Sequence, residues 1–147
     1  MKPPIKSHPV NRPEPTTITG FPFFTAPVPA GVNFIPAAKI DHNIYMDKFL
    51  VRTSSATFLV QVEGESMIEA FIPNKALLVV DKLKPACTGD IIVATVNTEV
   101  TVKRLVKNFK GIFLSPANPR FKSIKITSEM DFKIWGVVVK IIIDPKN

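Results

Sequence analysis

Proline is the residue that most constrains this chain, because nine of its 14 prolines lie within the first 36 residues. Each proline removes a backbone hydrogen-bond donor and disfavours helix at the residue before it. No helix of useful length fits in this segment, which excludes an N-terminal helix-turn-helix domain. We predict an extended N-terminal arm over residues 1–39, which becomes apolar at Phe21-Pro22-Phe23-Phe24.

From residue 40 onwards the sequence changes to short apolar runs, rich in β-branched residues and separated by turn residues. Such runs, with almost no helical periodicity, predict a mainly β fold of short strands that are curled or packed in sheets. We assign this domain to residues 40–147. Gly136, inside the last run, predicts a bulge or a bend, and residues 43–50 have room for one or two helical turns. The predicted strands are Thr57–Val62, Leu77–Asp81, Ile91–Val96, Val100–Val106, Gly111–Leu114, Ile124–Thr127 and Phe132–Ile143.

Composition limits the class of protein. The chain has 147 residues, of which 46% are hydrophobic and 21% charged, as in a globular domain with one core. No apolar stretch approaches the ~18 to 20 residues that a membrane span needs, and no apolar segment follows Met1 as in a secretory signal. The single cysteine, Cys87, excludes an internal disulfide framework and a multi-cysteine metal site. We therefore expect a cytoplasmic protein without a membrane anchor, metal or cofactor.

The net charge of +7 is concentrated in one segment. Residues 100–128 contain seven basic residues and no acidic one, which is typical of a surface that faces nucleic acid or an acidic partner. A solvated sheet edge, where lysine discourages aggregation, is the alternative, and the absence of a recognition helix or an aromatic stacking set favours it. A weak DNA contact through residues 103–125 stays open. The basic residues are Lys103, Arg104, Lys107, Lys110, Arg120, Lys122 and Lys125.

A serine in a turn is the first candidate for catalysis. The predicted β core contains no histidine, which disfavours a Ser-His-Asp triad. Gly64-Glu65-Ser66-Met67 directly follows the first predicted strand of that core. Glycine lets the chain turn sharply and leaves a serine and its neighbouring backbone N–H groups exposed, where they can hold an oxyanion.

Lys103 is the second candidate, as the base that such a serine needs. In the predicted strand it shares a face with Thr101 and Leu105, because alternate residues of a strand point the same way. If that face is packed, lost hydration lowers the pKa of the amine from ~10.4 toward the ~7–8 at which it accepts a serine proton near neutral pH. Taken by itself, a lysine whose stem lies over apolar neighbours on a half-exposed strand is the more ordinary interpretation.

Several motifs, in the same order, resemble the LexA and UmuD family of self-cleaving Ser-Lys peptidases. The similarity extends from about Phe21 to the C-terminus. Its most specific feature is a Gly-x-Ser-Met turn followed, 37 residues after the serine, by the lysine of a Thr-Val-Lys-Arg-Leu strand. The matching segments are Val62-Glu63-Gly64-Glu65-Ser66-Met67, Leu77-Leu78-Val79-Val80-Asp81, Gly89-Asp90-Ile91-Ile92-Val93-Ala94, Thr101-Val102-Lys103-Arg104-Leu105, Leu114-Ser115-Pro116-Ala117-Asn118-Pro119 and Trp135-Gly136-Val137-Val138.

The resemblance implies a role for each of these residues. Ser66 would be the nucleophile, Lys103 the general base, and the backbone N–H groups of Ser66 and Met67 the oxyanion donors. Members of the family cut themselves between a small residue and glycine, and the arm supplies Ala30-Gly31. A small side chain and a glycine let the scissile carbonyl approach the serine closely. The resemblance also implies a curled β catalytic fold and a homodimer.

The arm decides which branch of the family the chain resembles. LexA and phage repressors carry a DNA-binding domain before the cut, and the prolines exclude one here. The similarity therefore favours UmuD, an SOS-response protein. On this basis we expect cleavage promoted by a RecA filament on single-stranded DNA. The truncated chain would then act beside a UmuC-like subunit in an error-prone translesion polymerase.

Two other functions stay open on the sequence. The chain is a non-catalytic interaction module if Ser66 and Lys103 never meet. It is a basic nucleic-acid-binding protein if residues 100–128 contact phosphates. A signal-peptidase-like enzyme, which also uses serine and lysine, is disfavoured because the sequence carries no membrane anchor.

Overall fold

The computed structural model describes residues 21–24, 40–51 and 54–146. The chain divides into two compact units after Phe49. In the first unit, strand β1 (Phe21–Phe24) pairs antiparallel with β2 (Ile40–Ile44), with Phe21 opposite Ile44. A short helix, α1 (Met46–Leu50), follows β2 and confirms the helical turns predicted over residues 43–50. The apolar part of the arm, Phe21–Phe24, is extended, as predicted. Its pairing with a second strand was not predicted from the sequence.

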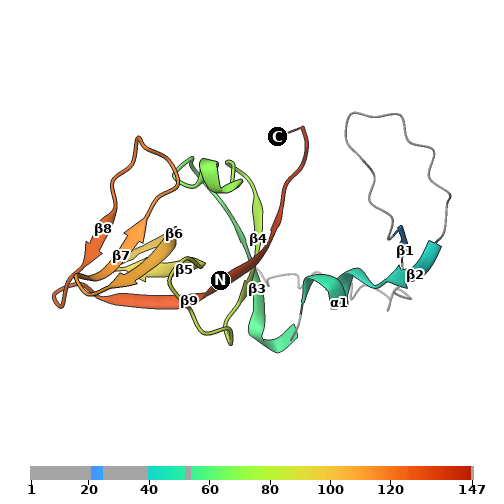
Figure 1. Ribbon diagram of the computed structural model, residues 1–147, viewed down its shortest axis with the longest axis horizontal. Coiled ribbons are helices and arrows are strands. Elements are labelled where there is room, and N and C mark those ends of the chain that lie inside the picture. The colour runs from blue at the N-terminus through green and yellow to red at the C-terminus, as the bar shows by residue number, and fades with distance from the viewer. Residues whose placement is uncertain (1–20, 25–39, 52–53, 147) are drawn as a thin grey trace, which may run out of the picture. The chain divides into compact units, whose positions relative to one another are not determined.

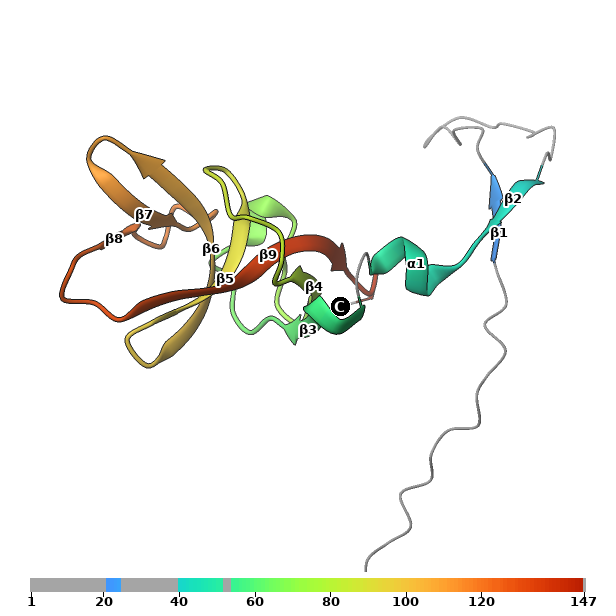
Figure 2. The same cartoon turned by 90° about the horizontal axis from the view of Figure 1, so that it is seen from below.

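The second unit is one curled antiparallel sheet with the strand order β3-β4-β9-β5-β6-β7-β8 (Figures 1 and 2). The predicted mainly β fold is thus confirmed, and each of the seven predicted strands lies within two residues of its predicted limits. Two short 3-10 turns, η1 (Ser54–Ala56) and η2 (Ile68–Ala70), flank β3. The strands are β3 (Thr57–Gln61), β4 (Leu77–Asp81), β5 (Ile91–Val96), β6 (Glu99–Asn108), β7 (Gly111–Ser115), β8 (Ile124–Ile126) and β9 (Phe132–Ile142).

Strand β9 joins the two halves of this sheet, since it pairs with β4 along one edge and with β5 along the other (Figure 1). Its register shifts at Trp135 against β5 and at Val139 against β4, so β9 carries two bulges. Gly136 lies beside the bulge at Trp135, which confirms the bulge or bend that we predicted at this glycine. A Cβ atom at Gly136 would stand 2.6 Å from the backbone oxygen of Asp81, so this close approach of β9 to β4 requires glycine.

The core lies on both faces of the sheet. Ile92 and Val93 are consecutive in β5 and point to opposite faces, yet both are fully buried. Val93 packs in a cluster with Leu78 and with Met67, which comes from the turn after β3. Ile92 packs in a second cluster with Leu105 and Leu114. The first cluster therefore seats the turn that contains Ser66 on the sheet.

Candidate functional site

A tight loop after β3 carries Ser66. Its base is closed by two backbone hydrogen bonds of Val62, whose N–H donates to the oxygen of Ala76 and whose oxygen accepts from Lys75 N–H, each at 2.8 Å. Gly64 takes a φ of +97°, a conformation that side chains disfavour, and turns the chain as its position in the sequence suggested. Met67, 2% exposed, then anchors the loop in the core directly beyond the serine.

The loop between β7 and β8 braces the serine turn from the other side. Ala117 N–H donates to the backbone oxygen of Ser66 at 2.8 Å, and its own oxygen accepts from Glu69 N–H at 2.9 Å. Asn118, which is buried, donates its side-chain amide to the backbone oxygen of Glu65 at 2.9 Å. The backbone on both sides of Ser66 is thereby fixed by hydrogen bonds, which holds the hydroxyl in one place.

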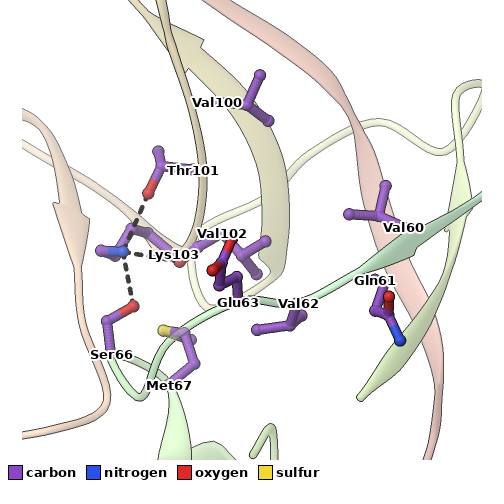
Figure 3. A pocket seen from close by; sticks show the side chains of 10 residues that line it. All are labelled: Val60, Gln61, Val62, Glu63, Ser66, Met67, Val100, Thr101, Val102 and Lys103. Atoms are coloured by element: carbon purple, nitrogen blue, oxygen red, sulfur yellow. Dashed lines mark hydrogen bonds between the residues drawn. The ribbon is translucent and has the colours of Figure 1, made fainter. Parts of the chain in front are cut away.

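Lys103 reaches this hydroxyl from the neighbouring part of the sheet. Its Nζ donates to Ser66 Oγ at 2.8 Å, to Thr101 Oγ1 at 3.0 Å and to the backbone oxygen of Val102 at 3.0 Å (Figure 3). The predicted common face of Lys103 and Thr101 in β6 is confirmed by the second of these contacts. Burial lowers the pKa of the Lys103 amine below its ordinary 10.5, because the charged form loses hydration.

The two side chains lie in a groove of about 250 Å³. Half of the lining residues are aliphatic or thioether side chains, the valines at positions 60, 62, 100 and 102 and Met67, and the other half are polar (Figure 3). The valines and Met67 offer a surface against which a small apolar segment of chain can pack. The lining is Val60, Gln61, Val62, Glu63, Ser66, Met67, Val100, Thr101, Val102 and Lys103.

The backbone N–H groups of Ser66 and of the next residue lie beside the serine hydroxyl. Within the described part of the chain, the N–H groups of Ser66 and Met67 donate to no acceptor, whereas that of Ile68, next along, donates to the oxygen of Glu65. Unpaired N–H groups next to a hydroxyl are the donors that an oxyanion needs.

The structure thus brings Ser66 and Lys103 together, but it does not describe Ala30 and Gly31, which lie outside the described residues. The sequence does not single out Thr101 as a hydrogen-bond partner of the amine, although strand alternation places it on the correct face. Nor does it single out Asn118, which enters only as part of the Leu114–Pro119 motif. In the sequence Asn118 is marked only as a polar residue in a loop between two apolar strands. This feature is too common to indicate a role by itself.

The sequence profile of the family described as Peptidase S24-like matches residues 22–139, most of the chain. The chain belongs to the Peptidase S24-like family. Members of this family are self-cleaving serine peptidases. The resemblance to the LexA and UmuD family, read from the sequence motifs, is confirmed.

The chain is similar to several LexA repressors and to the protein SamA. The S24-like chain is 36% identical to LexA repressor 1 of Xanthomonas campestris pv. campestris over 110 residues, which are 75% of this chain and 54% of the relative. It is 36% identical to the LexA repressor of Bordetella avium over 115 residues, 78% of this chain and 54% of that protein. It therefore spans about half the length of these repressors. Protein SamA of Salmonella typhimurium is 34% identical over 129 residues, 88% of this chain and 89% of SamA.

No helix in the described part of the S24-like chain is long and apolar enough to span a membrane.

Proposed function

We propose that this chain is a serine peptidase that cleaves itself, with Ser66 as the nucleophile and Lys103 as its general base. The observation that carries the proposal is the 2.8 Å contact between Lys103 Nζ and Ser66 Oγ in the groove between the serine loop and β6. Serine is a weak nucleophile unless a base within hydrogen-bond reach removes its proton. Lys103 is the base at that distance, and burial favours its neutral form.

The hydrogen bonds of Lys103 define how the neutral amine would act. A neutral amine has two N–H donors and one lone pair. If the donors bind Thr101 Oγ1 and the Val102 oxygen, the lone pair faces the hydroxyl of Ser66. The Ser66 proton then moves to Nζ while Oγ forms a bond to the scissile carbonyl carbon. The carbonyl π electrons move to its oxygen and make it an oxyanion.

The remaining steps return the enzyme to its starting state. The free N–H groups of Ser66 and Met67 stabilise the oxyanion by hydrogen bonds. When the tetrahedral intermediate collapses, the C–N bond breaks and Lys103 donates its proton to the leaving amine. Neutral Lys103 then takes a proton from water, and the water oxygen attacks the carbonyl carbon of the Ser66 ester. As the ester bond breaks, Lys103 returns this proton to Ser66 Oγ, and the released carboxylic acid loses its own proton to solvent.

The bond that we propose as the substrate is Ala30–Gly31, in the arm over residues 1–39. The short alanine side chain suits the small groove beside Ser66, and glycine adds no side chain that would hinder approach of the carbonyl. Cleavage there would release residues 1–30 and leave Gly31–Asn147.

The biological role that we propose is that of a UmuD-like protein of the SOS response to DNA damage, in the cytoplasm. SamA, a UmuD-like protein, supports this role, because the match covers nearly the whole of SamA but only half of the LexA repressors. In this role a RecA filament on single-stranded DNA promotes cleavage by favouring the conformation with the arm in the groove. The truncated chain acts as a homodimer, the accessory subunit of a UmuC-like translesion polymerase.

Self-cleavage is tested with the purified full chain at alkaline pH, where the amine is neutral. We expect the fragment Gly31–Asn147, identified by mass spectrometry, and none from Ser66→Ala or Lys103→Ala. Lys133→Ala, an exposed lysine of β9 outside the groove, is the matched control and should cleave at the normal rate. Normal cleavage by either groove variant would overturn the dyad, whereas a fragment with a different N-terminus would overturn only the cleavage site.

A further inference from the structure

The basic segment, residues 100–128, has an outer part that the catalytic groove does not use. Lys103 lies in the groove, the guanidinium of Arg104 donates to the oxygen of Gly89 at 2.7 Å, and Arg120 forms an ion pair with Glu65. The exposed lysines of this segment include Lys110 and Lys125, both near the hairpin of β6 and β7. These two are therefore available to a ligand.

An exposed aromatic ring stands at the tip of this hairpin. Phe109 is 94% exposed, the highest value among the exposed large hydrophobic residues of the described chain. The turn that presents it is ordered, since Asn108 pairs with Gly111 across the strands and the Asn108 side chain accepts Lys110 N–H at 2.9 Å. The ammonium of Lys110 lies 5.6 Å from the centre of the Phe109 ring.

A second ring and ammonium group lie beside the first pair. Phe113 of β7 is opposite Lys125 of β8, whose ammonium is 5.8 Å from the centre of the Phe113 ring. The stem of Lys125 also passes Gly111, within 3.6 Å of where a Cβ atom would stand, and this links it to the hairpin turn. We call these four residues, Phe109, Lys110, Phe113 and Lys125, the Phe109 patch.

No residue of the Phe109 patch lines the catalytic groove. The part of β6 that lines the groove ends at Lys103, whereas Phe113 is opposite Val106 and Phe109 lies beyond the end of the strand, at the hairpin tip. A ligand can therefore occupy the patch while the groove is occupied.

We propose that the Phe109 patch binds single-stranded DNA. Lysine on a sheet edge is explained by solubility, but a fully exposed phenylalanine is not. Surfaces that bind single strands combine aromatic rings, on which bases stack, with cations that follow the phosphates. The patch supplies one exposed ring, Phe109, one half-buried ring, Phe113, and two exposed ammonium groups within one hairpin and its neighbouring strand. An acidic protein would match the lysines but not the rings, and duplex DNA would hide its base faces.

Binding is measured by fluorescence anisotropy with a labelled strand of about 16 thymidines. Every variant is made in the full chain with Ser66→Ala, which keeps it intact, so the result does not depend on the proposed cleavage. We expect Phe109→Ala to weaken binding at least about fivefold, the loss of one stacked base. We expect Lys110→Ala with Lys125→Ala to reduce the slope of log affinity against log salt by about 1.4.

Matched controls distinguish binding at the Phe109 patch from binding to exposed lysines or phenylalanines elsewhere on the surface. Phe71→Ala removes another exposed phenylalanine, 80% exposed, and Lys75→Ala with Lys133→Ala removes two exposed lysines elsewhere. These controls should bind like the parent. The proposal is overturned if the patch variants and the controls bind alike, or if a strand without bases or a polyglutamate competes as well as the thymidine strand. Tighter binding of a uridine strand would overturn the assignment to DNA.

Discussion

Lys103 Nζ and Ser66 Oγ lie 2.8 Å apart although 37 residues separate them in sequence. The serine stands in a loop that is held by the core through Met67 and by the β7–β8 loop through Ala117 and Asn118. The lysine stands in the middle of β6, opposite Ile92 of β5, and the pairing of β6 with β7 begins at the next residue. Both groups are thus held by hydrogen-bonded elements of the sheet and its loops, so the dyad that we propose would need no ordering when a substrate binds.

The first prediction concerns the pH dependence of cleavage. Burial lowers the pKa of Lys103 below 10.5, and only the neutral amine accepts the Ser66 proton. The rate of self-cleavage should therefore rise with pH through this lowered pKa and become constant above it. The measurement is the first-order rate of fragment formation across a pH series in buffers of equal ionic strength.

The control for this prediction is a lysine variant that does not titrate. Lys103→Ala should leave only a residual rate with no rise over the same interval. A rate that falls as pH rises, or an identical profile for Lys103→Ala, would assign the base to another group.

The second prediction concerns Thr101, which accepts a hydrogen bond from Lys103 at 3.0 Å. Thr101→Val keeps the size of the side chain but removes the acceptor, so the lone pair of the neutral amine is no longer directed at Ser66. We expect cleavage to slow on the order of 10- to 100-fold, as for other displaced catalytic groups. Thr101→Ser retains the hydroxyl and should cleave at close to the normal rate, so equal rates for both variants would exclude this role.

The third prediction concerns Asn118, which bridges the two loops. Its buried amide donates to the oxygen of Glu65, and its side-chain oxygen accepts Arg120 N–H at 3.0 Å. Asn118→Ala leaves both backbone groups without this partner, at a cost of about 1–3 kcal/mol in the free energy of unfolding. Because the same bond fixes the turn of Ser66, cleavage should also slow under conditions in which the variant is fully folded.

Arg120→Ala provides the comparison for Asn118. It removes the exposed ion pair with Glu65, which contributes about 0–1 kcal/mol, and it leaves the backbone bond to Asn118 in place. Urea unfolding of both variants measures the difference. Equal losses of stability would mean that the buried amide of Asn118 stabilises the fold no more than the exposed ion pair does.

The sequence predicted the strands and the dyad for different reasons. The seven strands of the second unit follow from short β-branched runs and turn residues, which are local properties of the chain. The roles of Ser66 and Lys103 came from the resemblance, because neither Gly-x-Ser-Met nor a lysine in a strand is specific by itself. Their contact depends on the order of strands in the sheet, which no local pattern encodes.

The pairing of β1 with β2 and the exposure of Phe109 were not predicted, for similar reasons. Proline at position 22 argued for an extended chain but gave no partner, and an isolated pair of strands leaves no strong pattern in the sequence. Phe109 belongs to a segment whose charge was evident, but the position of its ring at the hairpin tip follows from the register of β6 against β7. The alternation of side chains along a strand predicts which residues share a face. It does not predict which residues lie at the tip of a hairpin.

The fourth prediction concerns Gly136, where β9 approaches β4. A Cβ atom there would lie 2.6 Å from the oxygen of Asp81 and 2.8 Å from Cγ1 of Val80, and the first of these atoms belongs to the backbone. Gly136→Ala must therefore separate the two strands, at a cost of about 1–3 kcal/mol in the free energy of unfolding. Lys133→Ala, exposed and three residues earlier in the same strand, should change it by no more than about 0.5 kcal/mol. The midpoints of urea unfolding measure both, and an unchanged midpoint for Gly136→Ala would show that the strands have room for a methyl group.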